Sequence, residues 1–270
     1  MVWKRLQITL CSILAATSVA ALAPPPRVHK LLGEVLEFEI RWGVIPVAHA
    51  TLEIHAGERE GQAITRVTAR SLPIIDAFHP IRDHIDATVW LPHLRPVTYE
   101  RVAQEGRGAA DREVLIFNRH DGVVQRFDSG KARPYLAVPD EVFDPLTCFF
   151  AYRTMPVRGD STVQIPVTDG HKLVIGDVRV VGHERVKTPA GTFDTVVVEP
   201  ELQDIGGIFR KSKNARILIW LTEDEWRRPV KLESAVAVGH FTALLKDVRW
   251  DEGFGPQNGS GVPSDAERAR

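Results

Sequence analysis

The dominant feature of the sequence is an alternation of apolar and polar residues with a period of two. In the stretch GEVLEFEIRW, the apolar residues Phe38, Ile40 and Trp42 alternate with acidic or basic residues. Successive side chains of a β-strand point to opposite faces of a sheet, so this pattern predicts strands with one buried face. About twelve to fourteen such runs follow one another, and Gly, Pro, Asn or Asp separates nearly every pair. Short, regularly spaced strands predict an antiparallel sheet system.

One stretch departs from this alternation and predicts a helix. Between Asp144 and Arg153, the apolar residues Leu146, Phe149 and Phe150 fall at helical spacing. Aspartate is a favoured helix N-cap, which places the start of the helix at Asp144. We expect Arg153 to point outward. The predicted fold class is therefore mainly β: an antiparallel, strongly curved or partly closed sheet, half-barrel-like, with one short packed helix.

The pattern is continuous enough to predict a single β-rich domain over residues 33–251. Two tandem half-barrels, divided near residue 145, are the alternative. Pairing of strands in 34–56 with strands beyond residue 215 would favour the single unit. Residues 252–270 are rich in Gly, Pro, Ser and charge, and we predict a disordered tail there.

The N-terminus has the pattern of an export signal. Lys4 and Arg5 precede a short apolar run with small residues at its end, which predicts a cleaved signal peptide over residues 1–20. Residues 21–32 then form an extended lead-in. We expect a periplasmic protein. A retained membrane anchor is the alternative, although the apolar run falls short of the roughly 20 residues that a membrane-spanning helix needs.

Composition restricts the classes of partner. The 270-residue chain carries 34 basic and 35 acidic residues, a net charge of −1, and 44% of its residues are hydrophobic. Such a balance is typical of a globular protein and does not indicate a nucleic-acid partner. Local patches of charge remain compatible with a near-zero total.

The sequence contains no set of residues that indicates catalysis or metal binding. Cys148, which would be the one cysteine left after signal cleavage, lies in the sequence TCFF, which favours burial in the core. Glu53 and His55 are two residues apart on a predicted strand and therefore share a face of the sheet. The same is true of His84 and Asp86. We interpret both pairs as solvated cross-strand contacts, because a metal site needs further ligands. We predict no catalytic residues, no metal and no cofactor.

The aromatic residues are the candidate binding residues. On one concave face they would line an apolar groove, and on a closed face they would form core. The candidates for ligand binding are Trp42, Trp90, Tyr99, Trp220 and Phe241.

Several blocks of the sequence resemble a bacterial exported-protein family known as domain of unknown function 3108. They are GEVLEFEIRWGVIPVAHATLEI, FDPLTCFFAYRTMPVRGD, VVGHERVKTPAGTFDTVVVEPEL and ARILIWLTEDEWRRPVKLESAVAVGHFTALL. The resemblance covers roughly residues 33–248. It implies export, a β-rich fold and a role in the cell envelope, and it assigns no catalytic residue. The curved sheets it implies are similar to lipoprotein-sorting half-barrels, which hold acyl chains.

Three functional hypotheses follow. The first is a non-enzymatic periplasmic protein that binds an apolar or envelope-derived, lipid-like ligand. The second is an envelope hydrolase whose residues meet in space, for example His84, Asp86 and His183. The third is a scaffold that binds an envelope protein through a sheet edge.

Overall fold

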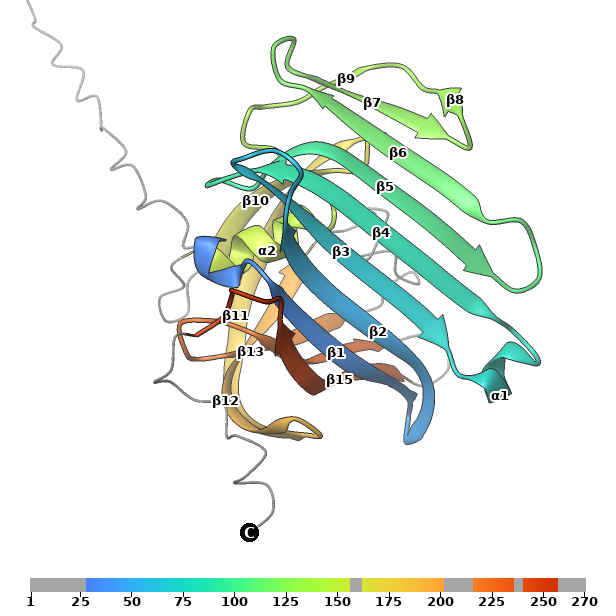
Figure 1. Cartoon of the computed structure of the whole chain (residues 1–270), viewed down its shortest axis with the longest axis vertical. Helices are drawn as coiled ribbons and strands as arrows, with labels where there is room; N and C mark the ends of the chain where they lie inside the picture. The colour runs from blue at the N-terminus through green and yellow to red at the C-terminus, as the bar shows by residue number, and fades with distance from the viewer. Residues whose placement is uncertain (1–27, 156–161, 202–215, 236–239, 257–270) are drawn as a thin grey trace, which may run out of the picture.

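The sheet dominates the computed structural model, which describes residues 28–155, 162–201, 216–235 and 240–256. Fifteen antiparallel strands in these residues form one sheet (Figure 1). Their bounds are β1 (Glu34–Trp42), β2 (Ile45–Ala56), β3 (Gln62–Ser71), β4 (Ile81–Trp90), β5 (Arg95–Glu105), β6 (Asp111–Asn118), β7 (Val123–Asp128), β8 (Lys131–Ala132), β9 (Leu136–Ala137), β10 (Thr162–Thr168), β11 (Leu173–Thr188), β12 (Gly191–Glu201), β13 (Ile217–Thr222), β14 (Pro229–Ala235) and β15 (His240–Trp250).

The order of the strands joins the two halves of the chain. The order is β10-β11-β12-β13-β14-β15-β1-β2-β3-β4-β5-β6-β7-β8, and β9 also pairs with β7. Strand β1 pairs with β15 over its whole length, from Glu34 opposite Trp250 to Trp42 opposite Phe241. This is the pairing between early and late strands that favours one unit over two tandem half-barrels. The sheet remains open, with β10 at one edge and β8 at the other.

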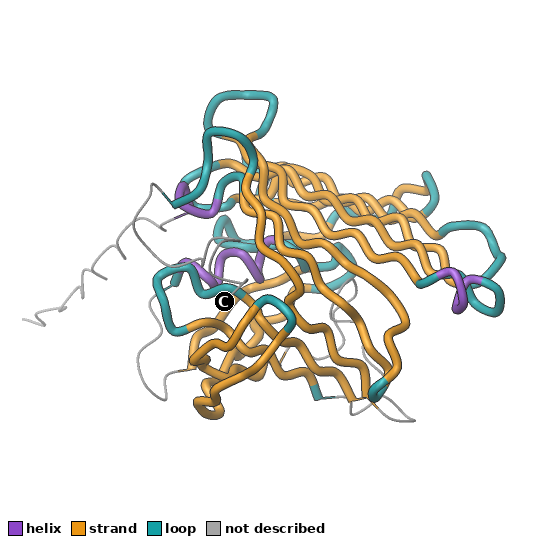
Figure 2. Tube along the Cα trace, turned by 60° about the horizontal axis from the view of Figure 1, so that its bottom comes forward, coloured by secondary structure: helices purple, strands orange, loops and turns teal. Residues whose placement is uncertain are grey.

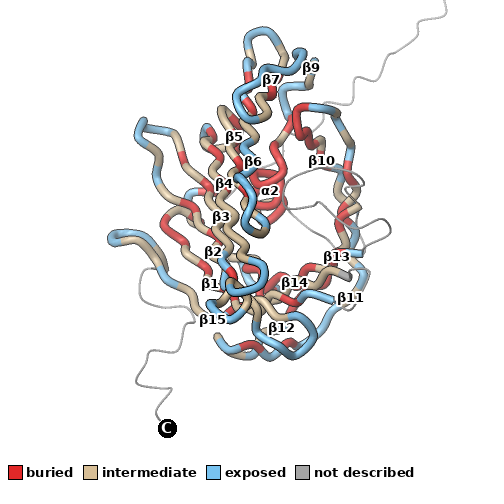
Figure 3. The backbone as a smooth tube through the Cα atoms, turned by 90° about the vertical axis from the view of Figure 1, so that its right-hand side faces the viewer, coloured by how far each residue is buried: buried red, intermediate tan, exposed pale blue. Residues whose placement is uncertain are grey.

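The sheet curves around a single short helix. Register shifts occur in β1 at Glu37/Phe38, in β4 at Thr88/Val89 and in β11 between Val180 and Gly182. Bulges of this kind bend a strand and increase its twist. Figure 2 shows the curvature of the strands, and Figure 3 shows buried helix α2 (Thr147–Thr154) between strands β1–β7 and strands β10–β13. The prediction of a mainly β, strongly curved sheet with one packed helix is confirmed.

The core follows the predicted alternation. On β4, Ile85, Ala87 and Val89 are buried while the residues between them are partly exposed. Helix α2 inserts Phe149 and Phe150 into the same continuous core. The two rings meet edge to face, with centroids 6.2 Å apart. Helix α1 (Pro73–Asp76) is a single turn, as the short proline-bounded stretch predicts. None of the helices within the described residues is long and apolar enough to cross a membrane.

Helix α2 begins later than the sequence indicates. We predicted its start at Asp144, but the helical residues begin at Thr147. Asp144 nevertheless satisfies the first turn, because its Oδ1 accepts the backbone N–H groups of Leu146 (2.9 Å) and Thr147 (2.8 Å). The Thr147 hydroxyl donates to the other carboxylate oxygen. Unpaired N–H groups at a helix start are costly when buried, so this buried carboxylate supports the helix.

The predicted orientation of Arg153 is wrong. Its side chain is buried and its Nη2 donates to the carboxylate of Glu34 on β1. The second oxygen of Glu34 accepts from Arg228 Nε at 2.8 Å. Arg153 Nε also donates to the backbone carbonyl of Arg227 at 3.0 Å. Arg153 points inward because the buried carboxylate of Glu34 and backbone carbonyl groups accept its hydrogen bonds there. These contacts offset the cost of burying its charge.

The ends of the domain differ from the predicted lead-in and tail. Val28–Leu31 forms a 3-10 helix rather than an extended segment, and Val28 and Leu31 are fully buried. At the other end, Phe254 packs against Gly33, whose φ of +82° suits glycine. Residues 1–27, including the predicted signal peptide over 1–20, and residues 257–270 lie outside the described part of the chain.

Truncation of Phe150 should reveal how far the fold depends on α2. Phe150 is 1% exposed, so Phe150→Ala should lower the free energy of unfolding by roughly 3–5 kcal/mol. Urea unfolding followed by circular dichroism measures this change. Ile116→Ala, at an apolar side chain that is 46% exposed on β6, is the control and should change stability much less. Equal losses in both variants would contradict the buried position of Phe150.

Neutralising Glu34 should destabilise the protein strongly. Glu34→Gln leaves two buried guanidinium groups without a counter-charge, and removing one partner of a buried pair costs roughly 3–5 kcal/mol. Glu37→Gln is the matched control on the same strand, because Glu37 pairs with Arg249 at the surface. Exposed pairs contribute about 1 kcal/mol or less. Chemical denaturation of both variants separates the two cases, and a small effect of Glu34→Gln would refute the arrangement.

Candidate ligand-binding site

An apolar cavity lies beside helix α2, between the helix and the C-terminal half of the sheet. It is small, with a volume of about 20 Å³, and it is open toward solvent on one side. Helix α2 forms one wall and strands β10, β11, β12 and β13 form the other. The cavity is lined by Cys148, Phe149, Tyr152, Ile165, Val167, Val178, Val198, Pro200, Ile219 and Leu221.

The local structure explains why these side chains meet. Residues two apart on a strand face the same side, which brings Ile165 with Val167 and Ile219 with Leu221 to the concave face. Residues three or four apart share one face of a helix, so Phe149 and Tyr152 project toward the same strands. The surface of the cavity is therefore aliphatic and aromatic.

The Tyr152 hydroxyl is buried without a hydrogen-bond partner in the described residues. The residue is 4% exposed, and burial raises the pKa of Tyr152 to about 12, an effect that the nearby Arg227 partly offsets. A phenol with this pKa remains protonated at neutral pH and keeps its proton available for donation. An unpartnered buried donor is rare in native proteins and calls for an explanation, such as an absent partner.

Cys148 lies in the same lining but lacks the features of a nucleophile. It is 3% exposed, and its thiol donates to the Pro145 carbonyl at 3.4 Å. Burial, and then the charge of Asp144, raise the pKa of Cys148 well above its usual value. Reactive cysteines have lowered pKa values. The prediction that Cys148 is a core residue is confirmed.

The structure distributes the five predicted aromatic residues over separate places. Trp42 and Phe241 lie opposite each other at the end of the β1–β15 pair and are both partly exposed. Trp90 is partly exposed at the end of β4, whereas Tyr99 is buried in the core. Trp220 alternates with cavity-lining Ile219 and Leu221 and therefore faces the other side of β13. Whether any of the five binds a ligand stays a prediction.

Trp220 has its own polar surroundings on that other side. Its Nε1 donates to the carboxylate of Glu184 at 2.6 Å, and the ammonium of Lys231 lies 3.9 Å from its ring centroid. These contacts account for its position without a ligand. The aliphatic residues of the cavity carry no signal of their own in the sequence, because Val and Ile at a period of two are equally typical of ordinary core.

The polar pairs on the strands are local contacts. Asp86 accepts from His84 Nε2 at 3.1 Å and from Arg66 on the neighbouring strand at 2.6 Å. His55 contacts Glu53 at 2.8 Å and Asp251 at 2.6 Å. Among the described residues, no three His, Cys, Asp or Glu side chains form a group that could hold a metal ion.

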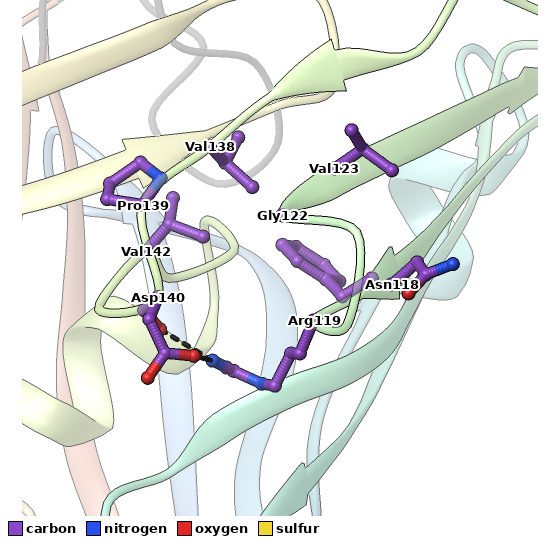
Figure 4. A pocket seen from close by; sticks show the side chains of 9 residues that line it. Asn118, Arg119, Gly122, Val123, Val138, Pro139, Asp140 and Val142 are labelled. Carbon is purple, nitrogen blue, oxygen red and sulfur yellow. Dashed lines mark hydrogen bonds and ion pairs between the residues drawn. The ribbon is translucent and has the colours of Figure 1, made fainter.

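A second hollow lies between the β6–β7 turn and the segment before α2 (Figure 4). Arg119 crosses it and donates from Nη1 to the side chain of Asp140 at 2.7 Å. Arg95 binds the other carboxylate oxygen of Asp140 at 2.6 Å. These two ion pairs hold the segment before α2 against the sheet. We therefore interpret the hollow as part of the structure and not as a binding site.

The fold and the cavity define a class: a β-rich, half-barrel-like domain whose open sheet holds a helix and an apolar cavity. The chain belongs to the family described as "Protein of unknown function (DUF3108)", whose pattern matches residues 37–246. The resemblance seen in the sequence is thereby confirmed. No curated protein matches the chain.

Solved structures resemble the chain at low sequence identity. A β-barrel-like protein of the DUF1849 domain from Brucella abortus is 12% identical, with a TM-score of 0.54 over 83% of this chain and 100% of that one. A provisionally assigned lipoprotein from Parabacteroides distasonis is 11% identical, with a TM-score of 0.28 over 82% of this chain and 96% of that one. At these identities the first similarity supports the fold alone.

Asp144 should make stability depend on pH. Burial raises its pKa to about 6, against hydrogen bonds from Thr147 and Leu146 that lower it. The folded state then binds the proton more tightly than the unfolded state, so this contribution is full below pH 4 and is lost as pH rises through 6. The unfolding free energy of the wild type, relative to Asp144→Asn, should fall by roughly 3 kcal/mol over that range.

The amide of Asp144→Asn does not titrate, so the difference between the two proteins isolates this one group from other carboxylates. Urea titrations at intervals from pH 3.5 to 7.5 supply the measurement. A difference that stays flat, or grows as pH rises, would show that the hydrogen bonds outweigh burial.

Proposed function

We propose that this protein is an exported, periplasmic, non-enzymatic carrier of an apolar, acyl-chain-like ligand. The observation that carries the proposal is the apolar lining between helix α2 and strands β10–β13, which has to widen to admit an acyl chain because the space it encloses is small. Binding sites for small molecules are concave, mostly apolar and furnished with a few polar groups that orient the ligand. The export-signal pattern at residues 1–20 supports the location.

Tyr152 indicates which chemical group the ligand carries. Its side chain lines the cavity, whose surface is apolar, and its buried hydroxyl is a donor without a partner in the described residues. A ligand with a long apolar chain and an oxygen acceptor, such as a carboxyl or ester group, satisfies both features. The half-buried Arg227 lies close enough to influence the pKa of Tyr152 and favours an acceptor with negative charge.

Neither alternative hypothesis gains support from a particular contact. The histidines suggested for a hydrolase lie in separate polar pairs: His84 contacts Asp86, and His183 contacts Glu223 at 2.6 Å. Strand edges at β10 and β8 are available to any open sheet and do not indicate a partner. The apolar lining between helix α2 and strands β10–β13 supports the binding of an apolar ligand.

Filling the cavity should abolish binding. Val198 lines the cavity on β12, while Val197 is similarly buried but faces the opposite side of the strand. Val198→Phe should lower the affinity for a fluorescent polyene fatty acid at least tenfold, whereas Val197→Phe should retain it. Circular dichroism and thermal unfolding check that both variants fold. Equal affinities in folded Val198→Phe and wild-type protein would refute the cavity as the site.

Removal of one hydroxyl tests the orientation of the ligand. Tyr152→Phe should lower the affinity for a fatty acid by up to about tenfold, which corresponds to the loss of one hydrogen bond. The affinity for a hydrocarbon chain without a head group should not change. Stability should not fall, because the lost hydroxyl has no partner in the described part of the chain. Native mass spectrometry of protein purified from a cell envelope then identifies the co-purifying ligand. Identical losses for both probes would contradict a role for this donor.

A further inference from the structure

The ring of His55 bridges two acidic side chains that come from different segments of the chain. Its Nδ1 lies 2.6 Å from Oδ2 of Asp251, and its Nε2 lies 2.8 Å from Oε2 of Glu53. Glu53 and His55 belong to β2, whereas Asp251 directly follows β15. The ring therefore links β2 to the segment after β15, which lies 196 positions further along the chain.

The two contacts, made to ionised carboxylates, require a protonated ring. An ionised carboxylate accepts hydrogen bonds and donates none, so each ring nitrogen must carry a hydrogen. A neutral imidazole carries one N–H and presents a lone pair at its other nitrogen. On deprotonation one carboxylate loses its donor, and the remaining contact loses the strength that the positive charge gives it. The geometry around His55 therefore suits one protonation state.

The other cations near His55 have partners of their own. They are Arg66 on β3, bound to Asp86; Arg249 on β15, bound to Glu37; and Lys30 of the 3-10 helix, bound to Glu225. Arg66 also lies opposite Glu53 across the strand pair. The other charged or titratable residues of the adjoining segments are exposed, namely His29, Glu58, Arg59, Glu60 and Glu252. Protonated His55 is therefore the cation that contacts both Asp251 and Glu53 directly.

The acidic neighbours of His55 stabilise the protonated ring. Partial burial lowers the pKa of His55, but the hydrogen bonds and charges of Asp251 and Glu53 together outweigh burial, so the pKa is raised above its usual value. Such a group contributes stability that is fully present below its pKa in the unfolded chain. The contribution is lost as pH rises through the pKa of the folded state.

The segment held by His55 packs against the start of β1. The Asp251 N–H donates to the Gly33 carbonyl at 2.8 Å, and the Phe254 N–H donates to the Asp251 carbonyl at 3.1 Å. The side chain of Phe254 packs against Gly33, the residue before buried Glu34. We name residues 251–256 the C-terminal strap. It lies at the strand end that carries the carboxylate shared by two buried arginines.

We propose that His55 is a pH-sensitive switch that controls how firmly the C-terminal strap is held: its protonated ring fastens the strap to β2, and deprotonation weakens that contact. The backbone bond to Gly33 and the packing of Phe254 remain after deprotonation. The strap therefore loosens while the sheet stays folded. The proposal concerns the domain itself and stands whether or not the cavity binds an acyl chain.

Hydrogen exchange of the full chain, followed by mass spectrometry between about pH 5.5 and 8.5, tests the proposal. After correction for the intrinsic exchange rate at each pH, protection of the strap should fall about tenfold over this range, which corresponds to the loss of one hydrogen bond. His55→Gln does not titrate at this position, so its strap should show little dependence on pH. The matched control, His183→Gln, removes an exposed histidine that contacts one carboxylate and should behave like the wild type.

Asp144 is present in all three proteins, so comparison among them separates its pH dependence from that of His55. Nuclear magnetic resonance of the His55 ring adds a second readout, in which Asp251→Asn should lower the pKa of His55. Circular dichroism checks that each variant folds. The proposal is overturned if strap protection in the wild type does not change with pH, or if folded His55→Gln keeps the wild-type pH dependence. It is also overturned if Asp251→Asn leaves the pKa of His55 unchanged.

Discussion

A single buried carboxylate holds together three distant parts of this protein. Glu34 lies at the start of the first strand and contacts Arg153 at the end of helix α2 and Arg228 at the start of β14. Two guanidinium groups at this depth require a counter-charge, and Glu34 supplies it to both. The contacts of Glu34 hold helix α2 in its position against the sheet, with Phe149 and Phe150 facing the core.

The cavity depends on the same constraint. Helix α2 supplies one wall, and it is fixed at its start by Asp144 and at its end by Arg153. A helix of eight residues would gain little stability by itself, so its order comes from these contacts and from packing. The space between the helix and β10–β13 is thus a consequence of how firmly both ends are held.

The sequence predicts this architecture well where a local pattern of residues determines the structure. It predicts less well the contacts between residues that are far apart in the sequence. Alternation identifies most strands, and the spacing of Phe149 and Phe150 identifies α2. The orientation of Arg153 depends on Glu34, 119 positions earlier, which no local pattern reveals. The cavity residues could not be predicted, because Ile219 beside a void and a valine in solid core have the same sequence pattern.

The pairing of β1 with β15 has a consequence for how the chain acquires its structure. The first strand lies beside the last, so one side of β1 remains without its neighbour until nearly the whole polypeptide is available. Chains whose contacts join distant segments fold slowly, because closing a large loop precedes the gain from pairing. With its last described strand at the centre of the sheet, the domain cannot complete its hydrogen-bonded ladder until β15 is in place.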